Sequence, residues 1–322
     1  MSDIRVRKLK TLDILTSALD EAESLPILYE RICSTLEGFS SLEWKLHVVD
    51  NGSIDETWEV LKRLASIDKR VVGYRMSRTF LFDSAITATL DGADAEAIVI
   101  MCSDLQDPPE LIPKMIDKYE EGYDQVCAQI KSRKSVPFFV RILTRVFYRF
   151  ANVLSRGELP ENVSDFRLAS KACYEAAKQL RENNRFIRGQ FAWVGFRTYF
   201  LELERPNRIA GKSKFLQYPK LDSIWLGVRA VFSHSALPLI SVAGLGIFSS
   251  IVSIVITAIF SISWITFGVP FAGYGTIIGI IMSGFSLVLL GIGIIALYIA
   301  SIYEEVKKRP LYIISESTDK AL

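Results

Sequence analysis

Two oxygen-bearing side chains follow an apolar segment that ends abruptly. Residues 98–110 read IVIMCSDLQDPPE, and the apolar part stops just before Asp104 and Gln106. Hard divalent cations take oxygen ligands and are often held by one or two carboxylates together with substrate phosphates. Asp104 and the amide oxygen of Gln106 therefore predict a sparse Mg²⁺ or Mn²⁺ site that would bind a diphosphate. The competing interpretation is a loop that begins a helix, because DPPE suits Asp107 as an N-cap.

A third carboxylate ends another apolar segment. In HVVDNGSIDET, residues 47–57, Ser53 and Glu56 have the spacing of a capping box for a following helix, which gives both a structural explanation. Asp50 has no such explanation. A carboxylate in that place can accept a hydrogen bond from a nucleobase imide, so we predict that Asp50 contacts a nucleotide.

The elements that must position these side chains alternate along the chain. Apolar strands are expected at 12–19, 44–50, 70–76, 96–101 and 123–130, and helices at 21–39, 55–67, 83–94 and 108–122. This alternation predicts an α/β fold with a mostly parallel sheet and helices on both faces. Ligands of such sheets bind at the carboxyl ends of the strands, where Asp50 and Asp104 fall. The chain contains no GxGxxG or Walker motif, which removes the main support for dinucleotide and P-loop readings.

One long segment lacks charge altogether. Residues 235–303 contain no Asp, Glu, Lys, Arg or His, and a helical bilayer crossing needs roughly 20 apolar residues. A Gly- and Pro-containing turn at 267–275 divides the segment into helices expected near 237–265 and 276–302. Basic residues flank both ends of the pair. The sequence thus predicts a two-helix transmembrane hairpin and a multi-pass inner (plasma) membrane protein, with the N-terminal domain and both termini cytoplasmic.

Two basic segments lie between the predicted sheet and this hairpin. Residues 136–156 place aromatic side chains at helical spacing beside a stripe formed by Arg141, Arg145 and Arg149. This pattern is typical of a helix lying in a membrane interface, although an ordinary packed helix with solvated arginines also fits it. The segment RPNRIAGKSK, 205–214, is either a phosphate-binding loop or a solvated basic linker.

Several ordered motifs together resemble a known family. They are VVDNGSIDETWEVL, SRTF, DLQDPPELIPKMIDKYEEGYDQV, VSDFRLASKACYEA, NRFIRGQFAWVGFRT, ERPNRIAGKSKF and ASIYEEVKKRPLYII. Their order resembles glycosyltransferase family 2, and within it the polyprenyl-phosphate glycosyltransferases such as bactoprenol glucosyltransferases and dolichol-phosphate mannose synthases. The resemblance implies a GT-A (Rossmann-like) fold.

The resemblance also implies a role for individual residues. Asp165 matches an aspartate near the acceptor, often assigned as catalytic, with a helix cap for the following residues as the alternative. The other implied roles are catalysis and metal binding for Asp104, metal binding for Gln106, nucleotide binding for Asp50, Glu21, Asp20 and Ser103, and phosphate or acceptor binding for Arg141, Arg145, Arg205, Arg208, Lys212 and Lys214. Cys102 stands where the family has the first aspartate of its metal motif.

The implied activity is transfer of a hexose with inversion, from a nucleotide-sugar resembling UDP-glucose to a polyprenyl (undecaprenyl) phosphate. The implied regions are a GT-A domain at 1–134, an acceptor-side region with interfacial helices and the basic loop at 135–234, two transmembrane helices at 235–303 and a cytoplasmic tail at 304–322. The alternative is a catalytically weak or inactive scaffold that binds a nucleotide-sugar or lipid at the membrane. The net charge of +2 gives no indication of a nucleic-acid partner, and Gly-rich helix faces would permit a homo-oligomer.

Overall fold

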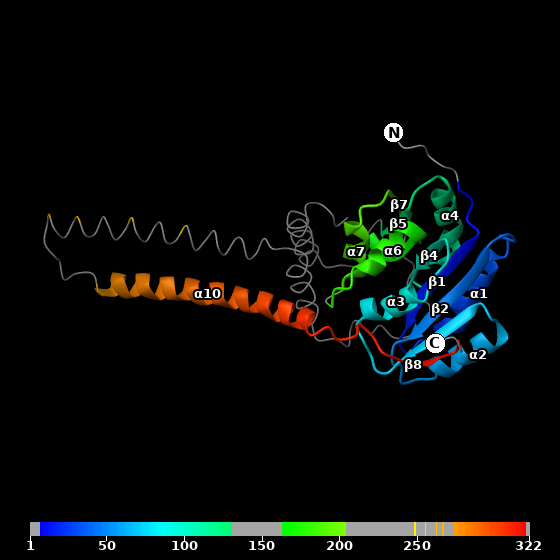
Figure 1. Ribbon diagram of the computed structural model, residues 1–322, viewed down its shortest axis with the longest axis horizontal. Helices are drawn as coiled ribbons and strands as arrows, with labels where there is room; N and C mark the ends of the chain where they lie inside the picture. The colour runs from blue at the N-terminus through cyan, green and yellow to red at the C-terminus, as the bar shows by residue number, and fades with distance from the viewer. Residues whose placement is uncertain are drawn as a thin grey trace. The chain divides into compact units, whose positions relative to one another are not determined.

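The computed structural model describes residues 7–130, 163–183, 185–203 and 274–319, with the single positions 248, 255, 262 and 266. The chain divides into two compact units, one formed by Met1–Pro219 with Arg309–Leu322 and the other by Lys220–Lys308. The described strands are β1 (Thr11–Ala18), β2 (Glu43–Asp50), β3 (Val71–Met76), β4 (Ala97–Ile100), β5 (Gln125–Ile130), β6 (Val163–Ser170), β7 (Thr198–Leu203) and β8 (Ile314–Ser317). They form an eight-stranded sheet in the order β7-β5-β6-β4-β1-β2-β3-β8 (Figure 1).

The centre of this sheet is parallel, as predicted. Strand β1 pairs in parallel with β2 and β4, and β2 pairs in parallel with β3. Strand β6 runs antiparallel between β4 and β5, and β8 runs antiparallel along β3. The predicted α/β sheet is therefore confirmed, and it is mixed because β6 and β8, which the sequence pattern did not reveal, enter it in the opposite direction.

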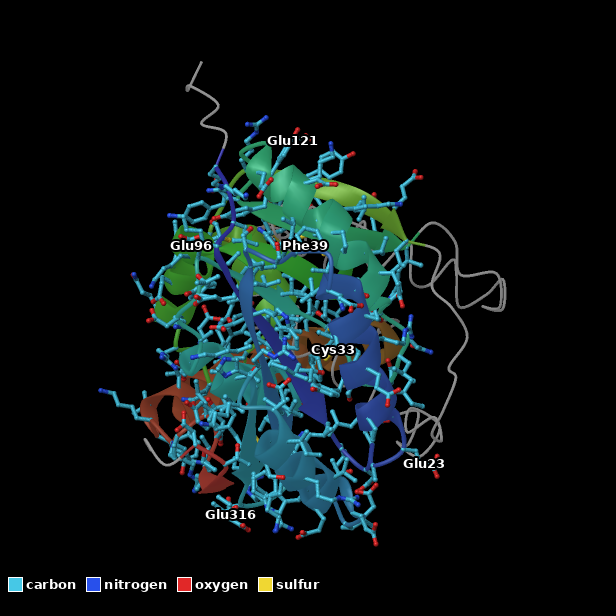
Figure 2. All side chains as sticks on the ribbon, turned by 90° about the vertical axis from the view of Figure 1, so that its right-hand side faces the viewer. Glu23, Cys33, Phe39, Glu96, Glu121 and Glu316 are labelled. Atoms are coloured by element: carbon cyan, nitrogen blue, oxygen red, sulfur yellow. The ribbon has the colours of Figure 1, made fainter. Side chains whose placement is uncertain are left out.

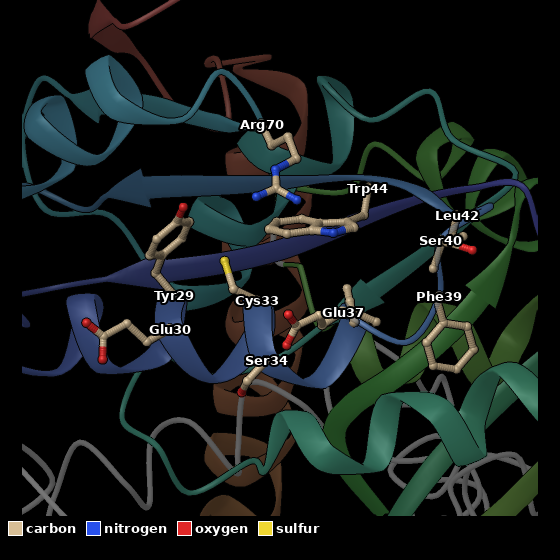
Figure 3. Close-up of a pocket in the computed structure, with 11 residues that line it drawn as sticks. Tyr29, Glu30, Cys33, Ser34, Glu37, Phe39, Ser40, Leu42, Trp44 and Arg70 are labelled. Carbon is tan, nitrogen blue, oxygen red and sulfur yellow. The ribbon is translucent and has the colours of Figure 1, made fainter.

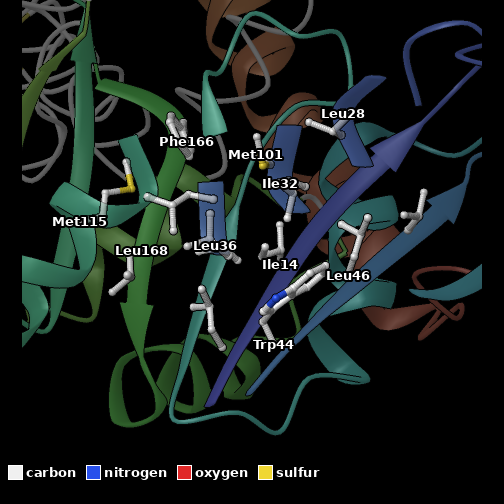
Figure 4. Close-up of a cluster of buried hydrophobic side chains, with 14 of the residues drawn as sticks. Ile14, Leu28, Ile32, Leu36, Trp44, Leu46, Met101, Met115, Phe166 and Leu168 are labelled. Atoms are coloured by element: carbon white, nitrogen blue, oxygen red, sulfur yellow. The ribbon is translucent and has the colours of Figure 1, made fainter. Parts of the chain in front are cut away.

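Helices cover both faces of the sheet. One face carries α1 (Ser24–Leu36), α2 (Thr57–Ile67), the 3-10 turn η1 (Pro109–Leu111) and α4 (Ile112–Glu120), and the other carries α3 (Phe82–Asp91), α6 (Lys171–Gln179) and α7 (Ile187–Trp193). The larger core lies on the first face, where Leu28 and Ile32 of α1 pack with Ile14, Leu46 and Phe166 of the strands (Figure 4). Burial on both faces explains why β4 reads AIVI without alternation.

The second unit contains the long helix α10 (Tyr274–Val306), which confirms the helix predicted at 276–302. The helix predicted at 237–265 lies outside the described residues except for positions 248, 255 and 262. Within the described ranges, no helix combines the length and the apolarity that a membrane crossing needs. The predicted location, a multi-pass protein of the inner membrane with both termini cytoplasmic, is therefore wrong on this finding.

A buried carboxylate joins the start of the sheet to a distant loop. Asp13 Oδ2 accepts hydrogen bonds from the backbone N–H groups of Asp94, at 2.9 Å, and Ala95, at 3.1 Å, and its Oδ1 lies 3.5 Å from His47 Nε2. Burial acts to raise the pKa of Asp13. The contacts with His47 and the two backbone groups outweigh burial, so this pKa lies below its ordinary value.

We expect Asp13→Ala to lower the free energy of unfolding by about 2 kcal/mol at pH 7, because one buried and one partly buried N–H group lose their acceptor. A carboxylate with a lowered pKa stabilises the fold above its unfolded pKa, roughly 3.9, and this stabilisation disappears as the pH falls. The difference between wild type and variant should therefore shrink in urea unfolding at pH 3. Asp94→Ala, which removes an exposed partner of Lys171, is the control. Equal unfolding midpoints for the two variants would contradict the assignment.

Candidate functional site

The carboxyl ends of the central parallel strands bring three loops together. Ala18 of β1 is in register with Asp50 of β2, and Leu15 of β1 with Ile100 of β4. The hydroxyl of Ser103, after β4, donates to the carbonyl of Ser17 in β1 at 2.8 Å. The loops that follow β1, β2 and β4 therefore share one edge, where ligands of parallel sheets bind.

Asp50 has a buried side-chain oxygen that lacks a hydrogen-bond partner among the described residues. Its side chain is fully buried, and Oδ1 accepts a bond from the Ser53 backbone N–H at 2.9 Å. The other oxygen, Oδ2, makes no hydrogen bond with any described residue. Arg75 Nε lies 3.6 Å from Oδ2, beyond hydrogen-bond length. A buried acceptor left open is costly, so a ligand donor is the natural partner for it.

The neighbouring nucleotide-binding candidates take part in the loop framework. Asp20 adopts a left-handed backbone with φ of 47°, its N–H donates to Ser53 Oγ at 2.9 Å, and its Oδ1 accepts from the Ile54 N–H at 2.9 Å. Glu21 is buried, and its carboxylate accepts the Ser24 hydroxyl. The predicted capping box is wrong, because α2 begins after Glu56 with no side-chain cap.

The metal candidates lie in the loop after β4. The Gln106 N–H donates to Asp104 Oδ1 at 3.1 Å across Leu105, whose φ of 62° is rare for leucine, and both polar side chains are half-buried. The Asp107 carboxylate accepts the Cys102 N–H at 3.0 Å. The N-cap of η1 is Pro108, so the helix-cap interpretation of Asp107 is wrong.

The donor set in this loop fits a sparse cation site. Asp104 supplies a carboxylate and Gln106 an amide oxygen, and both ligand types suit a hard divalent ion that also binds phosphates and water. Cys102 adds no suitable ligand for such an ion. Within the described ranges there is no cluster of three or more His, Cys, Asp and Glu residues suited to a metal. Most of the coordination would therefore come from the ligand.

Asp165 lies at the same edge, on β6. Arg167 pairs with Ile100 of β4, so the antiparallel register places Asp165 beyond the end of β4 at the level of Cys102. Its carboxylate forms a bidentate ion pair with Arg188, in which Nη2 donates to Oδ2 at 2.6 Å and Nε donates to Oδ1 at 3.1 Å. The N-cap of α6 is Ser170, whose side chain accepts the Cys173 N–H, so the helix-cap alternative for Asp165 is excluded.

Two groups beside Asp165, Arg188 and Asp83, are not among the predicted site residues. Arg188 lies within NRFIRGQ, one of the motifs on which the family resemblance rests. That motif is the feature of the sequence that could have indicated a role for Arg188. Asp83, at the start of α3, accepts the Ile187 N–H at 3.0 Å, and it interacts electrostatically with Asp165, Arg188 and Arg185. Burial raises the pKa of Asp83 to about 6, with the negative charge of Asp165 acting in the same direction.

The predicted phosphate- and acceptor-binding residues Arg141, Arg145, Arg205, Arg208, Lys212 and Lys214 lie outside the described residues. A separate groove of about 660 Å³ lies beside α1, where Tyr29 and Cys33 face Trp44 and Arg70 (Figure 3). Trp44 is at the amino end of β2, about 20 Å along the strand from Asp50. None of the predicted site residues lines this groove.

Comparisons with known proteins identify the family and the fold. The model of glycosyl transferase family 2 matches residues 13–198. The chain is 33% identical over 306 residues to the "Uncharacterized glycosyltransferase sll0501" of Synechocystis, covering 95% of each chain. It is 34% identical over 307 residues to the "SfII prophage-derived bactoprenol glucosyl transferase" of Shigella flexneri, covering 95% of this chain and 98% of that one.

A solved structure gives the fold. Glucosyl-3-phosphoglycerate synthase of Mycobacterium tuberculosis, in complex with Mn²⁺, UDP and phosphoglyceric acid, aligns with a TM-score of 0.50 at 15% identity, covering 69% of this chain and 76% of that one. The family match and the fold together define a glycosyltransferase of the GT-A class. The chain belongs to glycosyl transferase family 2, which confirms the predicted resemblance.

We expect Asp83→Asn to remove a pH-dependent loss of stability. The pKa of Asp83, raised to about 6, means that wild-type stability falls as the pH rises from about 4 to about 6, because the buried group must ionise. In urea unfolding at pH 4.5 and pH 7.5, the variant should therefore gain stability relative to wild type at the higher pH. Asp117→Asn, on the exposed face of α4, is the control. A difference that does not change with pH would contradict the shifted pKa.

Proposed function

We propose that this glycosyltransferase moves glucose from UDP-glucose to a polyprenyl phosphate such as undecaprenyl phosphate. The observation that carries the donor half is the open oxygen of Asp50 at the carboxyl edge of the sheet. The acceptor half is supported by relatives named bactoprenol glucosyl transferase, which match nearly the whole chain.

The donor would bind with its base against Asp50. An ionised carboxylate only accepts hydrogen bonds, and the imide N–H of uracil is a donor of matching polarity. The loop formed by Asp20, Glu21 and Ser53 would border the nucleoside, and the Ser103–Ser17 bond holds the loop after β4 beside it.

The diphosphate would then lie against Asp104 and Gln106. A divalent cation, Mg²⁺ or Mn²⁺, bound there would neutralise the charge that develops on the departing diphosphate. Asp104 would supply the carboxylate for it and Gln106 the amide oxygen. The basic residues Arg205, Arg208, Lys212 and Lys214 are proposed to contribute further positive charge to the same phosphates.

The acceptor would approach from the side of Asp165. In the transfer, an oxygen of the acceptor phosphate forms the new bond to the anomeric carbon while the bond from that carbon to the diphosphate breaks, with inversion. A phosphate monoester has a second pKa near 6, so its attacking oxygen is largely ionised at neutral pH. Asp165 would accordingly orient the acceptor through its pair with Arg188 more than remove a proton. Arg141 and Arg145 are proposed to attract the same anionic head group.

The test is a transfer assay with purified full-length protein, UDP-[¹⁴C]glucose, detergent-dispersed undecaprenyl phosphate and Mg²⁺ or Mn²⁺. We expect label in the organic phase. Asp104→Asn should lower the rate by about 100-fold, the size of effect seen when one group that stabilises a leaving charge is lost. Asp117→Asn keeps the same change of charge on an exposed helix face and should leave the rate unchanged.

Two results would contradict the proposal. Wild-type protein that binds UDP-glucose but leaves no label in the lipid would favour the non-catalytic scaffold. If Asp104→Asn forms labelled lipid at the wild-type rate, the loop after β4 does not take part in catalysis. A panel of other nucleotide-sugars in the same assay identifies the donor if UDP-glucose fails.

A further inference from the structure

A row of alternating charges crosses three neighbouring strands. Asp50 of β2 is in register with Arg75 of β3, and Arg75 is in register with Glu316 of β8. The order is therefore negative, positive, negative across the edge of the sheet. The side chains become more exposed outwards, from 0% at Asp50 to 37% at Arg75 and 50% at Glu316.

Glu316 is held at both of its oxygens. Arg75 donates to Oε1 at 2.9 Å, and the indole N–H of Trp58 in α2 donates to Oε2 at 3.1 Å. The bond from Arg75, followed by that from Trp58, keeps the pKa of Glu316 below its usual value. Glu316 lies on β8 at the edge of the sheet (Figure 2). It therefore presents a fixed negative charge to Arg75.

Strand β8 is firmly attached to the edge of the sheet. Thr318 N–H donates to the Gly73 carbonyl at 2.9 Å, and Gly73 N–H donates to Thr318 Oγ1 at 2.8 Å. The Tyr312 hydroxyl donates to Asp91 of α3 at 2.8 Å. A Cβ atom on Gly73 would lie 2.8 Å from Leu61 and 3.1 Å from Thr318, so glycine permits this close packing. Glu316 thus has a defined position although it is distant in sequence.

Arg75 attracts Asp50 without occupying its open oxygen. The 3.6 Å separation is too long for a hydrogen bond but still within the range of an ion pair. Because Glu316 restrains the guanidinium, the positive charge stays beside Oδ2, and this buried oxygen keeps no hydrogen-bond partner among the described residues. A neutral side chain in place of Arg75, or an Arg75 no longer held by Glu316, would let the Asp50 carboxylate change its orientation.

We propose that Arg75 and Glu316 are positioning residues for the nucleobase, and that β8 is thereby a functional part of the donor site. This inference rests on the proposed function, in which Asp50 reads the uracil imide. It predicts an effect on base selectivity, because uracil presents an N–H at N3 where cytosine presents a bare acceptor. A residue that only stabilised the fold would change the affinity for both bases together.

The experiment measures the dissociation constants of UDP and CDP by calorimetry, with Mg²⁺ and full-length protein. We expect wild type to prefer UDP. Arg75→Met should weaken the affinity for UDP about fivefold and Glu316→Gln about threefold, which is the range for partly exposed charge pairs, and the affinity for CDP should change less than twofold. Arg75→Lys should retain more of the preference than Arg75→Met because it keeps the charge.

A double variant tests whether Glu316 acts through Arg75. Adding Glu316→Gln to Arg75→Met should cause no further loss of UDP affinity, because the two residues belong to one chain of contacts. Ser315→Ala is the control: it removes a hydroxyl bond from β8 to the Arg75 carbonyl and leaves the charges in place, so the UDP-to-CDP ratio should not change.

The outcomes separate the two proposals. If wild type does not prefer UDP over CDP, the donor recognition by Asp50 is overturned. If wild type prefers UDP and Asp50→Asn loses that preference, while Arg75→Met and Glu316→Gln keep it, only the positioning role is overturned. The positioning role is also overturned if either variant loses affinity for UDP and CDP to the same extent while its thermal unfolding stays normal.

Discussion

The register of three parallel strands is the constraint on which the site depends. Strand β1 pairs with β2 on one side and β4 on the other, so the loops that follow them must meet at one edge. The bond from Ser103 to the Ser17 carbonyl fixes the loop that carries Asp104 against the strand beside Asp50. A shift of one residue in β2 or β4 would turn Asp50 to the opposite face or move Asp104 along the edge.

The buried carboxylate of Asp50 and the partly exposed carboxylate of Asp165 have different surroundings and hence different uses. Asp50 keeps one oxygen open, while both oxygens of Asp165 contact Arg188. A carboxylate that is already paired is a poor proton acceptor and a good orienting group. This difference, rather than the residue type, supports base recognition at one position and acceptor orientation at the other.

Local patterns predicted the parallel half of the fold because they depend on nearby residues. Apolar strands alternating with helices located β1 to β5 and placed Asp50 and Asp104 at strand ends. They could not reveal β6 and β8, whose places in the sheet depend on pairing with strands distant in sequence. For the same reason Arg188 and Arg75 were missed as partners of aspartates. The helix-cap interpretation of Asp107 was wrong because its carboxylate bonds to Cys102 instead.

A crystal of the full-length protein grown with UDP and Mn²⁺ tests donor binding most directly, through the anomalous signal of the metal. We expect the ion about 2.1 Å from an Asp104 oxygen and the uracil imide nitrogen about 2.9 Å from Asp50 Oδ2. A nucleotide and ion bound away from both residues, for example in the groove beside Trp44 and Arg70, would contradict the assignment of this edge as the donor site.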